Sequence, residues 1–179
     1  MNKIIILPLL FFLAFCNSKK VISNVPEITV KEIKLDTIPT PCPENGICTI
    51  EILKNKTLNV SLDEFGKNYY TLGDDEFKKV IKYSFTKNKD PKYIDSGYRE
   101  EILFEIDNSD TQLSLRDLSF QKTKMIFGRL CYCKGATGYY KVEKGFLTLK
   151  KEKTGYLLNL SFKVNEVPQI ITEINRYIP

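Results

Sequence analysis

The alternation of apolar and polar residues constrains this chain more than any other feature of its sequence. In residues 81–85 and 102–106 the apolar side chains stand at every second position. An extended strand places such side chains on one face, against a core, and leaves its other face near water. We therefore expect a mainly β fold, an antiparallel meander arranged as a sandwich or a barrel. The expected strands cover residues 49–53, 57–62, 80–85, 100–106, 124–133, 138–142, 146–150 and 156–164.

Short polar breaks separate these stretches and carry the residues that hairpin turns use. They lie at residues 54–56, 88–91, 107–110, 134–137, 143–145 and 153–155. Breaks of this length favour strands that follow one another as neighbours in a sheet.

The pattern changes near the C-terminus. Val167, Ile170, Ile171, Ile174, Tyr177 and Ile178 recur at helical spacing, and Pro168 is acceptable in a first helical turn. We expect a helix over residues 167–178 whose apolar stripe packs on the sheet. At residues 74–79 acidic side chains precede lysines, an order that suits either a short helix or a loop.

The absence of histidine limits the chemistry that is open to the chain. Every mechanism that needs an imidazole is excluded, including Ser-His-Asp catalysis and His-containing metal sites. The acidic clusters do not follow the calcium-loop pattern, and Glu100 and Glu101 would face opposite sides of a strand. We predict no catalytic residue, no metal site and no cofactor. A hydrolase whose carboxylates are brought together by the fold stays open as an alternative.

A leader sequence occupies the N-terminus. Lys3 precedes an apolar run that ends just before Cys16, which is the layout of a secretory signal peptide. The run is too short for a membrane-spanning helix, which needs about 20 residues. We predict a signal peptide at residues 1–15, a lipidated Cys with a polar, proline-containing tether at 16–41, and a single β-rich domain at 42–179.

Leu13-Ala14-Phe15-Cys16 resembles the lipobox of bacterial lipoproteins, and the Lys-, Asn- and Ile-rich composition resembles small lipoproteins of Bacteroidetes. The resemblance implies that Cys16 carries an acyl group such as palmitate and anchors the protein to a membrane. Phe15 stands where the lipobox has a small residue, so ordinary cleavage of the leader is the alternative. Acidic residues, which accompany surface export in those bacteria, are absent from residues 17–20. We therefore expect the outer membrane with the domain in the periplasm, and surface display as the second option.

Four cysteines remain once Cys16 is used: Cys42, Cys48, Cys131 and Cys133. An even number suits the disulfides of an oxidising compartment. Cys131 and Cys133 would share one face of a strand, where a direct bond is strained, so we expect them to pair with Cys42 and Cys48. Two local bridges follow closely in preference, because Pro43 and Asn45-Gly46 supply a turn within the first pair. A zinc site of four thiolates ranks last, since its spacings are unusual.

Residues 128–141 form the most unusual segment, with two Cys, three Gly and three Tyr. We expect a disulfide-stapled hairpin, which can also serve as a recognition surface through Arg129, Tyr132, Lys134, Tyr139 and Tyr140. Loss of Lys3 leaves 26 basic residues against 22 acidic ones, a net charge of +4, which is too small to indicate a nucleic-acid partner.

The sequence thus favours a non-catalytic envelope module that binds a protein, a glycan or an apolar ligand. An enzyme inhibitor or immunity lipoprotein, with the 128–141 hairpin entering an enzyme's cleft, is the first alternative.

Overall fold

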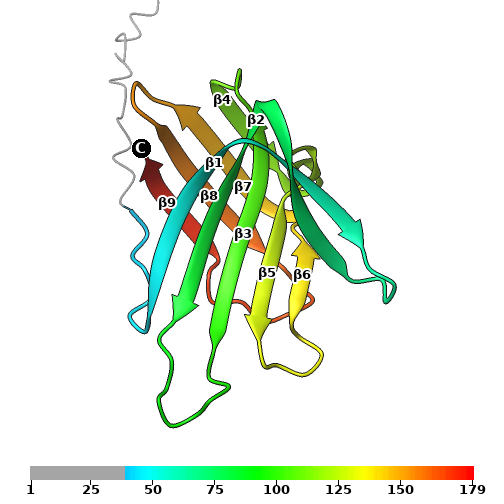
Figure 1. The fold of residues 1–179 in the computed structure, drawn as a ribbon. Helices are drawn as coiled ribbons and strands as arrows, with labels where there is room; N and C mark the ends of the chain where they lie inside the picture. Colours follow the sequence, from blue (N-terminus) through cyan, green and yellow to red (C-terminus); the bar gives the residue numbers. More distant parts are fainter. Residues whose placement is uncertain (1–38) are drawn as a thin grey trace, which may run out of the picture. The chain divides into compact units, whose positions relative to one another are not determined.

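The structure, a computed structural model, describes residues 39–179, called the β-rich unit below (Figure 1). The described residues form a mainly β fold with one short helical segment, which confirms the mainly β part of the expected fold class. The elements are β1 (Gly46–Leu62), β2 (Asn68–Lys87), β3 (Tyr98–Asp107), β4 (Gln112–Arg116), the 3-10 helix η1 (Asp117–Thr123), β5 (Ile126–Cys131), β6 (Gly138–Lys141), β7 (Lys144–Lys151), β8 (Tyr156–Lys163) and β9 (Glu173–Ile178).

Two antiparallel sheets make up this part of the chain. The first has the order β1-β2-β3-β5-β6, and the second has the order β4-β7-β8-β9. Because β4 joins the second sheet, β5 returns to pair directly with β3. The first sheet also curls until the beginning of β2 meets β6, where Asn68 pairs with Tyr139. The result is a barrel-like arrangement.

Large apolar side chains occupy the space between the two sheets. The predicted alternation is confirmed: Ile81, Tyr83 and Phe85 of β2 point into this space, as do Ile102 and Phe104 of β3. The second sheet contributes Leu147, Leu149, Leu158 and Leu160, and η1 contributes Phe120. Each fully buried side chain of this size contributes about 1.5–3 kcal/mol to stability, so this core is the main stabilising element of the unit.

The expected turn at residues 54–56 is wrong, because it is an irregularity inside one long strand. The β1–β2 register shifts between Lys54 and Lys56, and Asn55 adopts a positive φ of 57°. A bulge of this kind bends a strand and increases its twist. Beyond it, residues 56–74 form a hairpin, called the arm below, that crosses the outer face of the first sheet (Figure 1).

The arm is fixed by a second apolar cluster. Leu58 is fully buried there against Val80 of β2, Leu103 of β3 and Ile126 of β5. These positions alternate with the core positions, so both faces of the first sheet are covered where the arm lies.

The expected C-terminal helix is wrong. Residues 173–178 form β9, which pairs with β8 from Glu173 opposite Ser161 to Ile178 opposite Tyr156. Val167, Ile171, Ile174 and Ile178 are indeed buried. Spacings of four residues keep side chains on one face of a strand as well as a helix, and the β-branched residues suit a strand. The expectation of a short helix or a loop at residues 74–79 is wrong too, because β2 runs through these residues.

The cysteines pair locally, so the preferred cross-pairing is wrong. Cys42 bonds to Cys48 and Cys131 bonds to Cys133, with Cα–Cα distances of 5.7 Å and 5.2 Å. Strands β2 and β3 lie between β1 and β5, and three inter-strand spacings of about 4.8 Å exceed the reach of a disulfide. The Cys131–Cys133 bond forms because β5 ends at Cys131. The four sulfur atoms are therefore not the zinc site that ranked last.

The predicted signal peptide, Cys16 and the tether up to residue 38 lie outside the described residues. The last part of the predicted tether is attached to the domain: the Thr40 amide donates to the Asn175 carbonyl (3.0 Å), and the Asn175 amide donates to Thr40 Oγ1 (3.0 Å). No helix within residues 39–179 has the length and apolar character that crossing a membrane requires.

Candidate binding site

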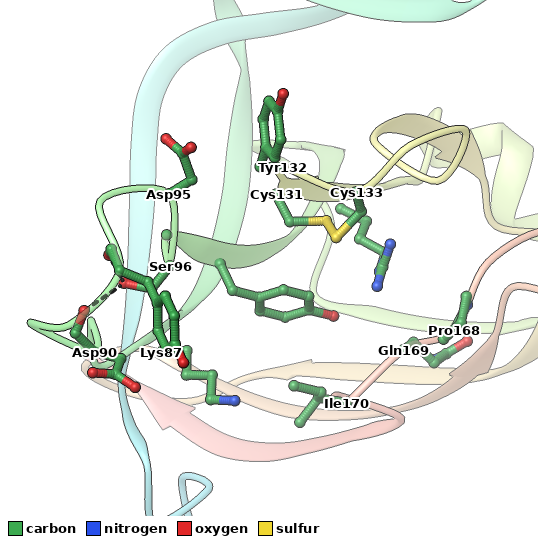
Figure 2. A pocket seen from close by; sticks show the side chains of 14 residues that line it. Lys87, Asp90, Asp95, Ser96, Cys131, Tyr132, Cys133, Pro168, Gln169 and Ile170 are labelled. Atoms are coloured by element: carbon green, nitrogen blue, oxygen red, sulfur yellow. Dashed lines mark hydrogen bonds between the residues drawn. A yellow bond between two sulfur atoms is a disulfide. The ribbon is translucent and has the colours of Figure 1, made fainter.

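Three connections meet at one end of the sheets, called the loop end below, and surround an open cleft of about 500 Å³. They are the β2–β3 loop (residues 88–97), the β5–β6 loop (132–137) and the β8–β9 segment (164–172) (Figure 2). The lining residues are Lys87, Asp90, Tyr93, Asp95, Ser96, Gly97, Tyr98, Arg129, Cys131, Tyr132, Cys133, Pro168, Gln169 and Ile170.

The β2–β3 loop is held by its own hydrogen bonds. The Tyr93 amide donates to the Asp90 carbonyl (3.1 Å), and Ser96 Oγ donates to the carbonyls of Asp90 (3.0 Å) and Tyr93 (2.8 Å). The Lys92 amide donates to Asp90 Oδ1 (2.9 Å), the Asx-type contact that makes Asp a good turn residue. These bonds hold the turn, and the loop presents Tyr93 and Ile94 to solvent, 58% and 98% exposed.

The β5–β6 loop presents Tyr132, which is 87% exposed, between the two half-cystines. In Figure 2 its ring extends away from the Cys131–Cys133 bond. The Ala136 amide donates to the Cys133 carbonyl (3.1 Å), and Gly135 supplies the positive φ of 75° that this turn requires. The disulfide and the turn thus restrict the backbone on both sides of Tyr132.

The β8–β9 segment is fixed to a buried carboxylate. Glu100, 1% exposed, accepts hydrogen bonds from the amides of Ile170 and Ile171, both at 2.7 Å. Gln169 adds three bonds to the backbone, accepting from the Val164 amide and donating to the Phe162 and Ile171 carbonyls. Ile170 remains 45% exposed beside the cleft.

Tyr98 and Arg129 lie where the cleft meets the core. The Tyr98 hydroxyl donates to Glu100, and the Arg129 guanidinium lies 5.4 Å from the centre of the Tyr98 ring. Burial, followed by the bond to Glu100, raises the pKa of Tyr98 to about 12, so this hydroxyl stays protonated at neutral pH. Arg129 Nη1 donates to the Ala136 carbonyl (3.0 Å), which ties the β5–β6 loop to the strand.

The five recognition residues expected from the sequence do not share one surface. Arg129 and Tyr132 line the cleft, and Lys134 is exposed in the same loop as Tyr132. Tyr140 packs partly against the core. Tyr139 lies on the outer face of the first sheet, where its hydroxyl donates to Glu101 (3.1 Å) and burial raises its pKa. Neighbouring residues of a strand face opposite sides, which separates Tyr139 from Tyr140.

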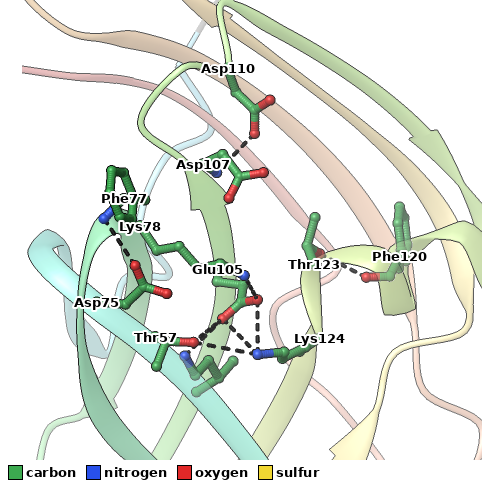
Figure 3. A network of polar contacts seen from close by, with 11 residues as sticks. Thr57, Asp75, Phe77, Lys78, Glu105, Asp107, Asp110, Phe120, Thr123 and Lys124 are labelled. Atoms are coloured by element: carbon green, nitrogen blue, oxygen red, sulfur yellow. Dashed lines mark hydrogen bonds and ion pairs between the residues drawn. The ribbon is translucent and has the colours of Figure 1, made fainter.

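The outer face also holds a buried ion cluster around Glu105, which is 4% exposed (Figure 3). Lys78 Nζ lies 2.8 Å and Lys124 Nζ 2.9 Å from Glu105 Oε1, while Thr57 Oγ1 (2.8 Å) and the Leu58 amide (2.9 Å) donate to Oε2. Burial acts to raise the pKa of Glu105, but these donors together outweigh it and hold the pKa at about 2. The cluster attaches the arm to the sheet.

Each of the three buried glutamates of β3 is engaged by hydrogen bonds or ion pairs. Glu100 faces the core and binds backbone amides, whereas Glu101 and Glu105 face the arm. Glu101 contacts Lys82 Nζ (3.2 Å) and Arg99 Nε (3.0 Å). Within residues 39–179, no group of three or more Cys, Asp or Glu side chains is arranged to hold a metal ion.

The sequence missed Tyr93, Ile94, Tyr98 and Ile170. The polar break at 88–91 predicted a loop, but its proximity to the β5–β6 loop depends on β3 pairing with β5. Once β4 is assigned to the other sheet, the antiparallel order brings these two loops to the same end. Ile170 was expected to lie on the apolar stripe of a helix over residues 167–178, so its place beside the cleft was not predicted.

No family model, no curated protein and no solved structure matches this chain significantly.

Proposed function

We propose that this chain is a cell-envelope lipoprotein whose domain recognises a partner protein, without catalysis, through the loop end just described. One observation carries the proposal: exposed side chains with large apolar groups from three separate connections, Tyr93, Tyr132 and Ile170, line a single cleft, and Ile94 is exposed next to Tyr93 in the same loop. Scattered single apolar residues on a surface need no explanation, but a cluster that surrounds a cleft marks an interaction site.

The residue types favour a protein partner. Tyrosine and arginine are enriched among the residues that dominate protein interfaces, and Tyr132 and Arg129 both line the cleft. The flanking disulfide restricts the backbone at Tyr132, which lowers the conformational entropy that binding costs. Lys87 and Asp90 add charges of both signs, which fits a partner with a mixed polar surface.

Two other ligand classes receive less support. A small apolar ligand needs an enclosed site, but the space between the sheets is occupied by buried residues such as Phe104 and Phe127. A glycan could stack on the tyrosines, but it would not explain Ile94, which has no polar atom in its side chain and is almost fully exposed.

The lipoprotein part of the proposal is supported by the resemblance of Leu13-Ala14-Phe15-Cys16 to a lipobox. The mature chain is then expected to begin at Cys16 and to carry acyl chains that hold it at the outer membrane, facing the periplasm. The intact mass of the native protein, before and after reduction, tests this directly. A mature chain that lacks Cys16, or that lacks added acyl mass, would refute it.

Site-specific photocrosslinking tests the recognition. A photoreactive phenylalanine analogue replaces Tyr132 or Ile94 in cells that make the protein, and replaces Tyr177 in a control. Tyr177 is 45% exposed on β9, away from the cleft lining. We expect one discrete protein adduct from positions 132 and 94 and none from 177. Equal crosslinking from all three positions, or none from any, would contradict the proposal.

An inhibitor of an envelope enzyme is the second candidate, because Tyr132 projects from a disulfide-closed loop that could enter an active-site cleft. If the crosslinked partner is an enzyme, its activity with and without the purified protein decides between inhibition and simple recognition.

A further inference from the structure

The outer edge of the arm has backbone groups that nothing in the described chain uses. The Leu58 amide donates to Glu105 Oε2, so it points away from β2, whereas the Asp63 amide donates to the Lys67 carbonyl across the hairpin (2.9 Å). Successive residues of an antiparallel strand alternate between bonding to the partner strand and pointing away from it. The N–H and C=O groups of Val60 and Leu62 therefore face outward, like those of Leu58.

Only one of these outward groups has a partner in residues 39–179. The Leu58 amide is occupied by Glu105, but the backbone groups of Val60 and Leu62 take part in no hydrogen bond outside the β1–β2 ladder. On the opposite edge of the arm, Asn68 of β2 pairs with Tyr139 of β6, whereas residues 69–74 have no strand partner on that side within residues 39–179. The β1 edge of the arm is thus an unpaired strand edge.

A cleft of about 410 Å³ runs beside this edge. It is lined on the arm side by residues 58–61 and on the other side by Gln121, Lys124 and Lys141. Lys124 forms an ion pair with Glu105. Lys141 is exposed, and no carboxylate of the described residues lies within ion-pair distance of it. The free charge at the cleft is therefore positive.

Devices that normally protect a strand edge are missing here. Natural edges are blocked by proline, by lysine in the strand or by a bulge. Residues 58–62 read Leu-Asn-Val-Ser-Leu, and the bulge of β1 lies earlier, at Asn55. An extended chain could bond to Val60 through both its N–H and its C=O.

We propose that this edge binds an extended, acidic peptide segment of a partner protein as an added β-strand. Backbone bonds to Val60 and Leu62 supply the pairing, and Lys141 selects carboxylate side chains. A second copy of the chain fits less well, because it would bring a second Lys141 and Lys124 to the same positive cleft. The proposal is independent of the loop end, which lies on other elements.

Nuclear magnetic resonance with defined peptides tests the proposal, using the protein as recovered from cells that express the full-length chain. The probes are an acetylated hexapeptide that alternates Glu and Val, its counterpart with Lys in place of Glu, and an N-methylated form of the Glu peptide. We expect the Glu peptide alone to slow hydrogen exchange at the amides of Val60 and Leu62. N-methylation removes the donors that a strand needs, so that form should not bind.

The Lys141→Glu variant should bind the Glu peptide about fivefold more weakly, the most that one exposed ion pair contributes. Lys153→Glu, a matched charge reversal in the β7–β8 turn, should leave binding unchanged. No protection at up to about 1 mM peptide, equal binding of the Lys peptide, or protection away from the arm would overturn the proposal. Protection of Val60 that needs no peptide and rises with protein concentration would also overturn it, because a second copy would then occupy the edge.

Discussion

Glu105 connects two layers of the fold through one side chain. It lies on the outer face of β3, where two lysines, Thr57 and the Leu58 amide surround it, and these donors hold its pKa at about 2. A carboxylate with a depressed pKa stabilises the folded state at every pH above its ordinary value of 4.5. This stabilisation declines as the pH falls below 4.5 and is gone near the folded-state pKa of about 2.

The first prediction concerns Glu105→Gln. The amide cannot pair with both ammonium groups, so the free energy of unfolding at neutral pH should fall by about 2–3 kcal/mol. The difference from wild type should shrink as the pH is lowered from 4.5 towards 2. Urea denaturation across this range measures it. Glu152→Gln, which removes the exposed pair with Lys150, is the control and should cost at most about 1 kcal/mol. A pH-independent difference would contradict the assigned pKa.

The second prediction separates binding from folding at Tyr132. The side chain is almost fully exposed, so Tyr132→Ala should change the free energy of unfolding by less than about 0.5 kcal/mol. Crosslinking from a photoreactive residue at position 94 should nevertheless fall more than tenfold, as for an interface anchor worth about 2 kcal/mol. Tyr177→Ala should leave crosslinking unchanged. Unimpaired crosslinking in the Tyr132 variant would show that Tyr132 is not the anchor.

Among the elements, local alternation predicted most strands because each hydrophobic face repeats every two residues within a few positions. It failed where a spacing fits both a helix and a strand. In β9, Ile174 and Ile178 are four residues apart, which places them on one face of either element. It also failed where a strand continues through polar residues: Asp74 and Asp75 belong to β2, where Asp74 is exposed and Asp75 is half-buried. Solvent-exposed strands lack the apolar signal on which such predictions depend.

The third prediction concerns the β5–β6 loop as an element. The double variant Cys131→Ser with Cys133→Ser opens a very short covalent loop, so the chain-entropy model gives a loss of only about 1–2 kcal/mol. Hydrogen exchange at Tyr132 should become faster, and crosslinking from position 94 should weaken, because the anchor is no longer preorganised. Replacing Cys42 and Cys48 is the matched control and should leave crosslinking intact. Unchanged hydrogen exchange at Tyr132 would show that the turn at Gly135 holds the β5–β6 loop without the disulfide.

Over the whole molecule, the candidate site depends on sheet order, which no single segment specifies. The β5–β6 hairpin was predictable from its cysteines and glycines, and two of its expected residues, Arg129 and Tyr132, do line the cleft. Their neighbours in space, Tyr93 and Ile170, come from connections far away in the sequence. Strand β4 pairs in the second sheet, so β3 and β5 are direct neighbours in the first sheet. This non-local pairing brings the connections of the loop end together.

The fourth prediction treats the lipid attached to Cys16 and the β-rich domain as separable parts of one molecule. If acylation of Cys16 holds the protein at the membrane, Cys16→Ser should release it from the membrane fraction, because buried acyl carbons contribute about 0.8 kcal/mol each. The released protein should still crosslink to the same partner from position 132, since the loop end is built only from residues of the β-rich unit. Cell fractionation combined with crosslinking measures both effects. Retention of the variant at the membrane would instead mean that the partner, or a surface of the domain, holds it there.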